Sequence, residues 1–133
     1  MKTLNYSRQR QAIWDFLCTR RDHPTADIIY RNVRSAFPNI SLGTVYRNLN
    51  LLADLGMIRK VKGLNDTEHF DGDTSPHQHF ICRKCGAVQD IFLKNEDLLR
   101  SMNIAAGKNF DGQIIENDIY FYGKCSRCFA AQT

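Results

Sequence analysis

Two histidines and two cysteines lie within the nine residues HQHFICRKC, positions 77–85. If this segment begins as a β-strand, side chains two positions apart point to the same face, so His77 and His79 can bind one metal ion together. Cys82 and Cys85 have the two-residue gap of a tight turn in which both thiolates reach one metal, and Gly86 lets the chain turn back. Because imidazole and thiolate differ in softness, the spacing indicates two ions of different kinds.

A second pair of cysteines, Cys125 and Cys128, repeats the two-residue gap near the end of the chain. The two pairs together supply four thiolates, which complete a tetrahedral zinc site with no open position, and such a site is structural rather than catalytic. A redox-active pair is the alternative. It is disfavoured because neither pair is expected to open a helix in a βαβ unit.

Composition and charge divide the chain into two halves. Its 133 residues are 43% hydrophobic, which suits one ordinary domain or two small ones and excludes a disordered chain. Lys and Arg outnumber Asp and Glu more than twofold in residues 1–63, whereas acidic residues predominate in residues 64–133, which are rich in His and Cys. This asymmetry predicts a polyanion-binding module joined to a metal-binding one, although a solvated basic face would carry the same charge.

The sequence carries no sign of a membrane or export segment. No stretch has enough consecutive apolar residues to cross a bilayer, and the N-terminal MKTLNYSRQR lacks an apolar run. We therefore expect a cytoplasmic protein with no membrane partner. In that compartment five cysteines, an odd number, indicate metal binding rather than disulfides.

Three helices are expected in the basic half. Ser7 can cap a helix that ends near residues 19–24, a second helix should extend over residues 26–37, and Ser41 can cap a third over residues 42–55. Two helices joined by a short turn, the second with a polar N-terminal face, are typical of a helix-turn-helix.

The alternating segments 57–63 and 66–71 flank a turn and predict a hairpin beside the third helix, the wing of a winged helix-turn-helix domain. In such a domain the third helix enters the major groove while the wing meets phosphates. The residues expected nearest the DNA are Ser41, Thr44, Tyr46, Arg47 and Asn48 on the helix and Arg59, Lys60 and Lys62 on the wing, with Arg8 or Arg10 available for phosphates.

We expect an α+β fold in two domains. A winged-helix DNA-binding domain occupies residues 1–72, a hinge residues 73–76, and a small α/β metal-binding dimerisation domain residues 77–133. In the second domain, HQHFIC and AVQDIFL should be strands, Asn95 should cap a short helix ending near Met102, and QIIENDIYFYG should form a longer strand. Its alternating faces, Ile119 and Phe121 against Tyr120 and Tyr122, suggest pairing with a second copy, although an ordinary core explains them almost as well.

Six motifs together resemble, in order and spacing, the ferric uptake regulator family. They are HPTAD at 23–27, GTVYRNLNLL at 43–52, HFD at 69–71, HQHFICRKCG at 77–86, VQDI at 88–91 and YGKCSRC at 122–128. The resemblance extends over nearly the whole chain, and within the family it points to the peroxide-sensing repressors. It implies a homodimeric winged-helix repressor with structural zinc on the four paired cysteines. It also implies a regulatory Fe(II) or Mn(II) site made of His23, Asp71, His77, His79 and Asp90.

Two features favour the peroxide-sensing branch over iron sensing. The carboxylate in VQDI is Asp90, where iron-responsive members typically have glutamate, and ENDI at 116–119 replaces a histidine common before the last strand. One departure concerns His69, because peroxide-sensing members usually have an arginine before FD. On a strand His69 and Asp71 share a face, so His69 is a possible extra or substitute ligand.

The implied ligands come from both domains and the hinge, so one ion would fix the domains in a single orientation. In a dimer this would set the spacing of the recognition helices for a palindromic operator. Iron and peroxide would then oxidise His23 or His77 and release the DNA. The alternatives are an iron-responsive repressor without peroxide sensing, and a non-haem iron oxygenase or hydrolase. We expect no enzyme, because no nucleophile or cofactor loop is visible and a site across a hinge would be poorly held.

Overall fold

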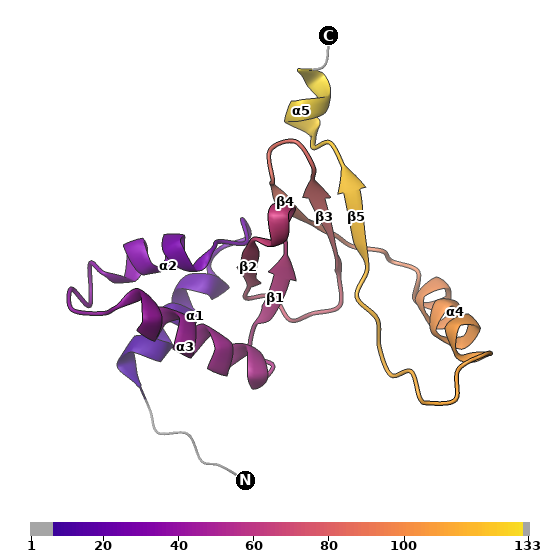
Figure 1. Cartoon of the computed structure of the whole chain (residues 1–133), viewed down its shortest axis with the longest axis horizontal. Coiled ribbons are helices and arrows are strands. Elements are labelled where there is room, and N and C mark those ends of the chain that lie inside the picture. Colours follow the sequence, from indigo (N-terminus) through magenta and orange to yellow (C-terminus); the bar gives the residue numbers. More distant parts are fainter. Residues whose placement is uncertain (1–6, 132–133) are drawn as a thin grey trace.

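The computed structural model describes residues 7–131 and has the predicted α+β fold. Its elements are α1 (Arg8–Cys18), α2 (Ala26–Val33), α3 (Leu42–Asp54), β1 (Arg59–Lys62), a 3₁₀ turn (Leu64–Asp66), β2 (Glu68–Asp71), β3 (Gln78–Cys82), β4 (Val88–Ile91), α4 (Glu96–Gly107), β5 (Tyr120–Gly123) and α5 (Ser126–Ala130). Figure 1 shows α1, α2 and α3 grouped on one side, the strands β3 to β5 on the other, and the hairpin of β1 and β2 between them. Within the described residues, no helix is long and apolar enough to span a membrane.

The predicted helix starts of the N-terminal half are confirmed by their caps. The Ser7 hydroxyl accepts the backbone N–H of Arg10, and the Ser41 hydroxyl accepts that of Thr44. The predicted end of the second helix is wrong, because α2 stops at Val33 and residues 34–36 form a turn. A proline at position 38 disfavours helical backbone at the residue before it, which prevents the helix from reaching residue 37.

An apolar core holds α1, α2, α3 and the hairpin together. Its fully buried side chains include Ile13, Leu17, Ile29, Val45, Leu49, Leu52, Ile58 and Phe70. Each such burial contributes about 1.5–3 kcal/mol of hydrophobic free energy relative to exposure. Because Phe70 comes from β2, the core fixes the wing against the helices and leaves the opposite face of α3, with Tyr46 and Arg47, exposed.

The wing is an antiparallel hairpin, as predicted, in which Arg59 lies opposite Asp71 and Lys62 opposite Glu68. Its turn contains Asn65 and Asp66 with φ of 55° and 61°. This left-handed conformation is tolerated by Asn and Asp better than by most other residues.

The C-terminal sheet has the order β4-β3-β5, with β3 antiparallel to β4 and parallel to β5. The Asn95 cap is confirmed, but α4 continues past the expected end to Gly107. The strand predicted over residues 113–123 is wrong before Tyr120. Its partner β3 begins only at Gln78, and Pro76 upstream cannot donate a hydrogen bond to extend the pairing.

The helix α5 was not predicted. Cys125 is its N-cap residue and Cys128 lies within it, so the second cysteine pair does open a short helix. The helix has only five residues and no strand follows it among the described residues, so the setting is not a βαβ unit.

The two halves also meet through an apolar cluster. Val61 of β1 is fully buried beside Ile81 of β3 and Val88 of β4, with Tyr120 of β5 packed against them. Tyr120 therefore faces this core, whereas Phe121 and Tyr122 are exposed. The cluster holds the wing against the sheet and brings the end of β2 near the start of β3.

Candidate metal centres

Five side chains converge between the two halves of the chain. They offer ligand atoms that all lie within 4.8 Å of one another: His23, Asp71, His77, His79 and Asp90. These are the five residues that the family resemblance implied. His23 lies in the loop between α1 and α2, Asp71 ends β2, His77 precedes β3, and His79 lies directly opposite Asp90 in the pairing of β3 with β4.

The separations within the cluster fit one shared cation. His23 Nε2 lies 2.7 Å from Asp90 Oδ1, and Asp71 Oδ2 lies 2.8 Å from His77 Nε2 and 3.0 Å from His79 Nε2. Donor atoms bound at right angles about 2.1 Å from one divalent cation would lie about 3.0 Å apart. The mixed nitrogen and oxygen set, without a thiolate, suits Fe(II) or Mn(II).

The hydrogen bonds around His77 independently indicate a cation. His77 Nδ1–H donates to the carbonyl oxygen of Ser75 at 2.7 Å, because a carbonyl can only accept. In the neutral ring, Nε2 then carries a lone pair, yet it faces the Asp71 carboxylate and lies 3.1 Å from His79 Nε2. Lone pairs at these distances repel unless a proton or a metal ion lies between them.

Because the cluster is buried, its charged groups must compensate one another. Four of its members are at most 4% exposed, and the Asp90 side chain is 13% exposed. Burial opposes protonation of His23, but the hydrogen bonds and charges of Asp71 and Asp90 outweigh it and raise the pKa of His23. Burial likewise opposes ionisation of Asp71, but the three histidines and the Asp73 N–H lower the pKa of Asp71 well below its ordinary value. A metal ion binding here would replace a proton on His23.

Two cavities border the cluster. A cavity of about 320 Å³ is lined by Asp71, Asp90, Cys18, Arg21 and neighbouring residues. A second cavity, of about 790 Å³, borders His77 and His79.

His69 does not join this cluster. Its Nδ1 lies 2.7 Å from the backbone carbonyl oxygen of His23, so it must carry the hydrogen and donate. Sequence reasoning considered His69 only as a possible ligand and missed this contact. The same reasoning missed Ser75, whose carbonyl orients His77, because the sequence gives no signal for a backbone acceptor.

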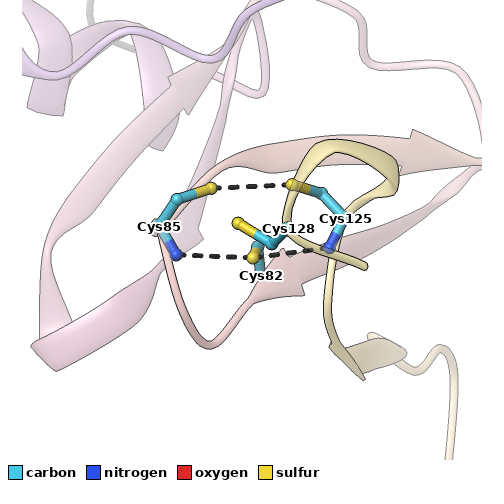
Figure 2. Close-up of side chains that lie close together, drawn as sticks. All are labelled: Cys82, Cys85, Cys125 and Cys128. Atoms are coloured by element: carbon cyan, nitrogen blue, oxygen red, sulfur yellow. Dashed lines mark hydrogen bonds between the residues drawn. The ribbon is translucent and has the colours of Figure 1, made fainter. Parts of the chain in front are cut away.

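The four paired cysteines form the second centre (Figure 2). Cys82 is the last residue of β3 and Cys85 lies in the turn after it, whereas Cys125 is the N-cap residue of α5 and Cys128 lies within that helix. Their sulfur atoms lie within 4.8 Å of one another, and the Sγ atoms of Cys85 and Cys125 are 3.7 Å apart. Zn–S bonds of about 2.3 Å in a tetrahedron place sulfurs about 3.8 Å apart. The set therefore fits structural zinc.

The surroundings of the four thiols favour ionisation of some of them but not of all, and a bound cation would allow the rest to ionise. The backbone N–H groups of Cys85 and Cys125 each lie 3.4 Å from Cys82 Sγ and lower the pKa of Cys82 to about 5. Burial and the neighbouring sulfurs raise the pKa of Cys128 to about 12. Four thiols this close cannot all ionise unless a positive ion compensates their charge, which zinc would do.

The predicted DNA-facing residues lie on one end of α3 and on the wing. Ser41, Tyr46 and Arg47 are exposed, whereas Thr44 and Asn48 are half-buried. The Arg47 guanidinium donates to the Thr44 hydroxyl at 3.0 Å. On the wing, the ammonium groups of Lys60 and Lys62 lie 3.5 Å from Glu68 and 3.8 Å from Asp66. Exposed pairs of this kind are weak and can yield to phosphate. Arg8 is exposed and Arg10 is half-buried.

The chain is similar to metal-dependent regulators in both sequence and fold. A model of the ferric uptake regulator family matches residues 1–122. The peroxide-responsive repressor PerR of Staphylococcus epidermidis is 35% identical over 120 residues, which cover 90% of this chain and 78% of that protein. The crystal structure of the Campylobacter jejuni peroxide stress regulator aligns with a TM-score of 0.75 at 30% identity, covering 90% of this chain and 88% of that one. The Helicobacter pylori ferric uptake regulator Fur, at 24% identity, shares the fold with a TM-score of 0.81 over 98% of this chain and 85% of that one.

Proposed function

Since this chain belongs to the ferric uptake regulator family, we propose that it is a metal-dependent DNA-binding repressor that senses peroxide. The observation that carries the proposal is the buried cluster of three imidazoles and two carboxylates, which joins the helical half to the sheet. A regulator of this kind is not an enzyme, because the ligands are consumed and no substrate is turned over.

The ligands of the regulatory ion are His23, Asp71, His77, His79 and Asp90. Asp71 holds the centre of the site, with its Oδ2 atom within 3.3 Å of Nε2 of all three histidines. Bound Fe(II) would supply the reduction of peroxide and an oxidant beside the ligands. In the net reaction one peroxide oxygen is added to the imidazole of His23 or His77 and the other leaves as water. An oxidised ring loses its donor geometry, so metal affinity falls.

The ligand set turns metal binding into a conformational switch. Residues 1–72 form the DNA-binding domain, residues 73–76 the hinge, and residues 77–133 the dimerisation domain. An ion bound simultaneously by His23 in the DNA-binding domain and by His79 in the dimerisation domain fixes the orientation of these two domains. Loss of the ion frees the hinge and releases the DNA.

The protein acts as a homodimer on a palindromic operator in the cytoplasm. Helix α4 has no buried residue, and Figure 1 shows it apart from the sheet. Its side chains Leu98, Met102 and Ile104 are exposed, as are Phe121 and Tyr122 of β5. An apolar surface of this extent fits a second copy of the chain, which would place two α3 helices on one face for two half-sites.

A gel-shift experiment tests the proposal. A palindromic A·T-rich DNA should be retained by the Mn(II) and Fe(II) proteins but not by the metal-free protein. Peroxide should release it only from the iron form, with a one-oxygen gain on the peptide containing His23 or His77. If peroxide released the DNA from neither the Mn(II) nor the Fe(II) protein, the protein would be an iron-responsive repressor without peroxide sensing. Release accompanied by cysteine disulfides and intact histidines would place the sensor at the zinc thiolates.

Arg47 on α3 and Lys62 on the wing should contribute to DNA binding in different ways. Replacing Arg47 with alanine should weaken operator binding by about 1–3 kcal/mol, because a base contact is lost, while the dimer stays intact. Replacing Lys62 should lower the slope of log affinity against log salt by about 1, with little change in sequence preference. Fluorescence anisotropy over a salt series measures both effects.

The matched control for charge is Lys94→Ala, exposed in the loop between β4 and α4 in the other half of the chain. It removes the same charge as Arg47→Ala and should leave operator affinity unchanged. Equal losses in Arg47→Ala and Lys94→Ala would indicate general charge attraction. Unchanged affinity in Arg47→Ala and Lys62→Ala would rule out this docking of α3 and the wing.

A further inference from the structure

His23 has a backbone conformation that needs support. Its φ angle is 54°, in the left-handed region that residues other than glycine rarely occupy. Such conformations persist only where surrounding structure fixes them, and they concentrate at functional sites. The side chain is 1% exposed, and its Nε2 atom lies 2.7 Å from Asp90 Oδ1 and 3.3 Å from Asp71 Oδ2.

The ring of His23 is not held from its far side, in contrast to that of His77. His77 Nδ1 is fixed by the Ser75 carbonyl, as metal-binding histidines usually are. His23 Nδ1 is buried and has no hydrogen-bond partner among the described residues. The direction of the His23 ring therefore depends on its backbone.

Two hydrogen bonds from β2 hold that backbone. His69 Nδ1–H donates to the carbonyl oxygen of His23 at 2.7 Å, and the backbone N–H of Phe70 donates to the carbonyl oxygen of Pro24 at 3.0 Å. The second bond would form with any residue at position 70 except proline. The first requires a donor side chain at position 69.

The His69 ring is itself confined. A methyl group at Gly63 would lie 2.6 Å from both Cδ2 and Nε2 of this ring, closer than any real contact, so the ring rests directly on the glycine backbone of the wing. This contact also directs Nε2 toward the wing turn while Nδ1 is used for the His23 carbonyl. His69 thus has no nitrogen left for the metal cluster.

We propose that His69 is a positioning residue that fixes the left-handed backbone of His23 and so presents the His23 imidazole to the metal and to oxidation. The inference rests on the proposed function for its link to peroxide. His69 lies outside the ligand set. Its loss should affect the imidazole of His23 and not that of His77, because His77 has its own support from Ser75.

The experiment compares two replacements at position 69. His69→Phe keeps a ring but has no donor, whereas the side-chain amide of His69→Asn can donate from the place of Nδ1. Isothermal titration with Mn(II) should show affinity reduced about threefold to tenfold in His69→Phe, the effect of one net hydrogen bond. His69→Asn should stay within about twofold of the original protein. Glu68→Ala, an exposed change on the same strand, is the matched control and should have no effect on Mn(II) affinity.

The oxidation pattern separates positioning from general destabilisation. With Fe(II) and peroxide, the share of added oxygen on the His23 peptide relative to the His77 peptide should fall in His69→Phe and be restored in His69→Asn. Unchanged Mn(II) affinity in His69→Phe would overturn the proposal, as would equal losses in both variants.

A measurement without metal or variants completes the test. In the metal-free protein, ¹⁵N NMR of the histidine rings should show His69 protonated at Nδ1 with a slowly exchanging hydrogen, and a ring protonated only at Nε2 would overturn the assignment. If the unmodified protein showed no iron-dependent oxidation, peroxide sensing would fail while the Mn(II) affinities and the ring tautomer still decided the role of His69.

Discussion

Replacing Cys82 with serine should remove the zinc ion and unfold the C-terminal sheet. Cys82 is fully buried at the end of β3, and its sulfur accepts N–H groups from both cysteine pairs. In small metal-stapled units the free energy of zinc binding is folding free energy, about 10–16 kcal/mol in zinc-finger peptides. That is comparable with the whole stability of a domain, about 5–15 kcal/mol. The melting temperature should therefore fall by more than about 10 °C.

The fifth cysteine provides a matched control. Cys18 is exposed at the end of α1 and belongs to neither metal cluster. Cys18→Ser changes the same atom and should keep one zinc per chain and the original melting temperature. Zinc is measured by elemental analysis and unfolding by circular dichroism. A Cys82→Ser protein with full zinc and unchanged melting would show that the four cysteines do not bind zinc.

The parts of the fold that follow from local sequence were predictable. Ser7, Ser41 and Asn95 each cap the helix that they were expected to cap, because a cap needs only the next three residues of the chain. The limits of β5 were not predictable, because they depend on where β3 offers a partner. The helix α5 has five residues, too few for a recognisable apolar periodicity.

The metal-binding residues were likewise predictable only where local sequence determines them. Side chains two positions apart on a strand share a face, which predicted that His77 and His79 lie together, and the two-residue gaps predicted the pairing of the cysteines. Spacing could not bring His23 to Asp90, which is 67 positions away, and only the resemblance to a family did so. The contact of His69 with the His23 carbonyl follows from neither source, since it depends on a turn conformation and on the space above Gly63.

Replacing Asp71 with asparagine should abolish metal-dependent DNA binding while preserving the fold. Asp71 Oδ2 is the atom that faces all three histidines, and Oδ1 accepts the backbone N–H of Asp73 at 2.9 Å. An asparagine keeps this second bond only with its oxygen toward Asp73, so its NH₂ group faces the histidines. An NH₂ group cannot bind a cation, but it can donate to the His77 Nε2 lone pair, which limits the loss of stability in the metal-free protein.

The affinity for Mn(II) should fall by more than about 100-fold, because even changes to groups that only support metal ligands cost about 10–100-fold. Electron paramagnetic resonance titration measures free Mn(II), and gel shift measures operator binding at each metal concentration. Asp73→Asn is the matched control, since it removes one negative charge two positions away while leaving the five ligand atoms in place. It should retain Mn(II) affinity within about fivefold. Equal losses in both variants would mean that the loop attracts cations by charge alone, and full metal-dependent DNA binding by Asp71→Asn would exclude Asp71 from the ligand set. Loss confined to Asp71→Asn would support ligation by the carboxylate that links the wing to the sheet.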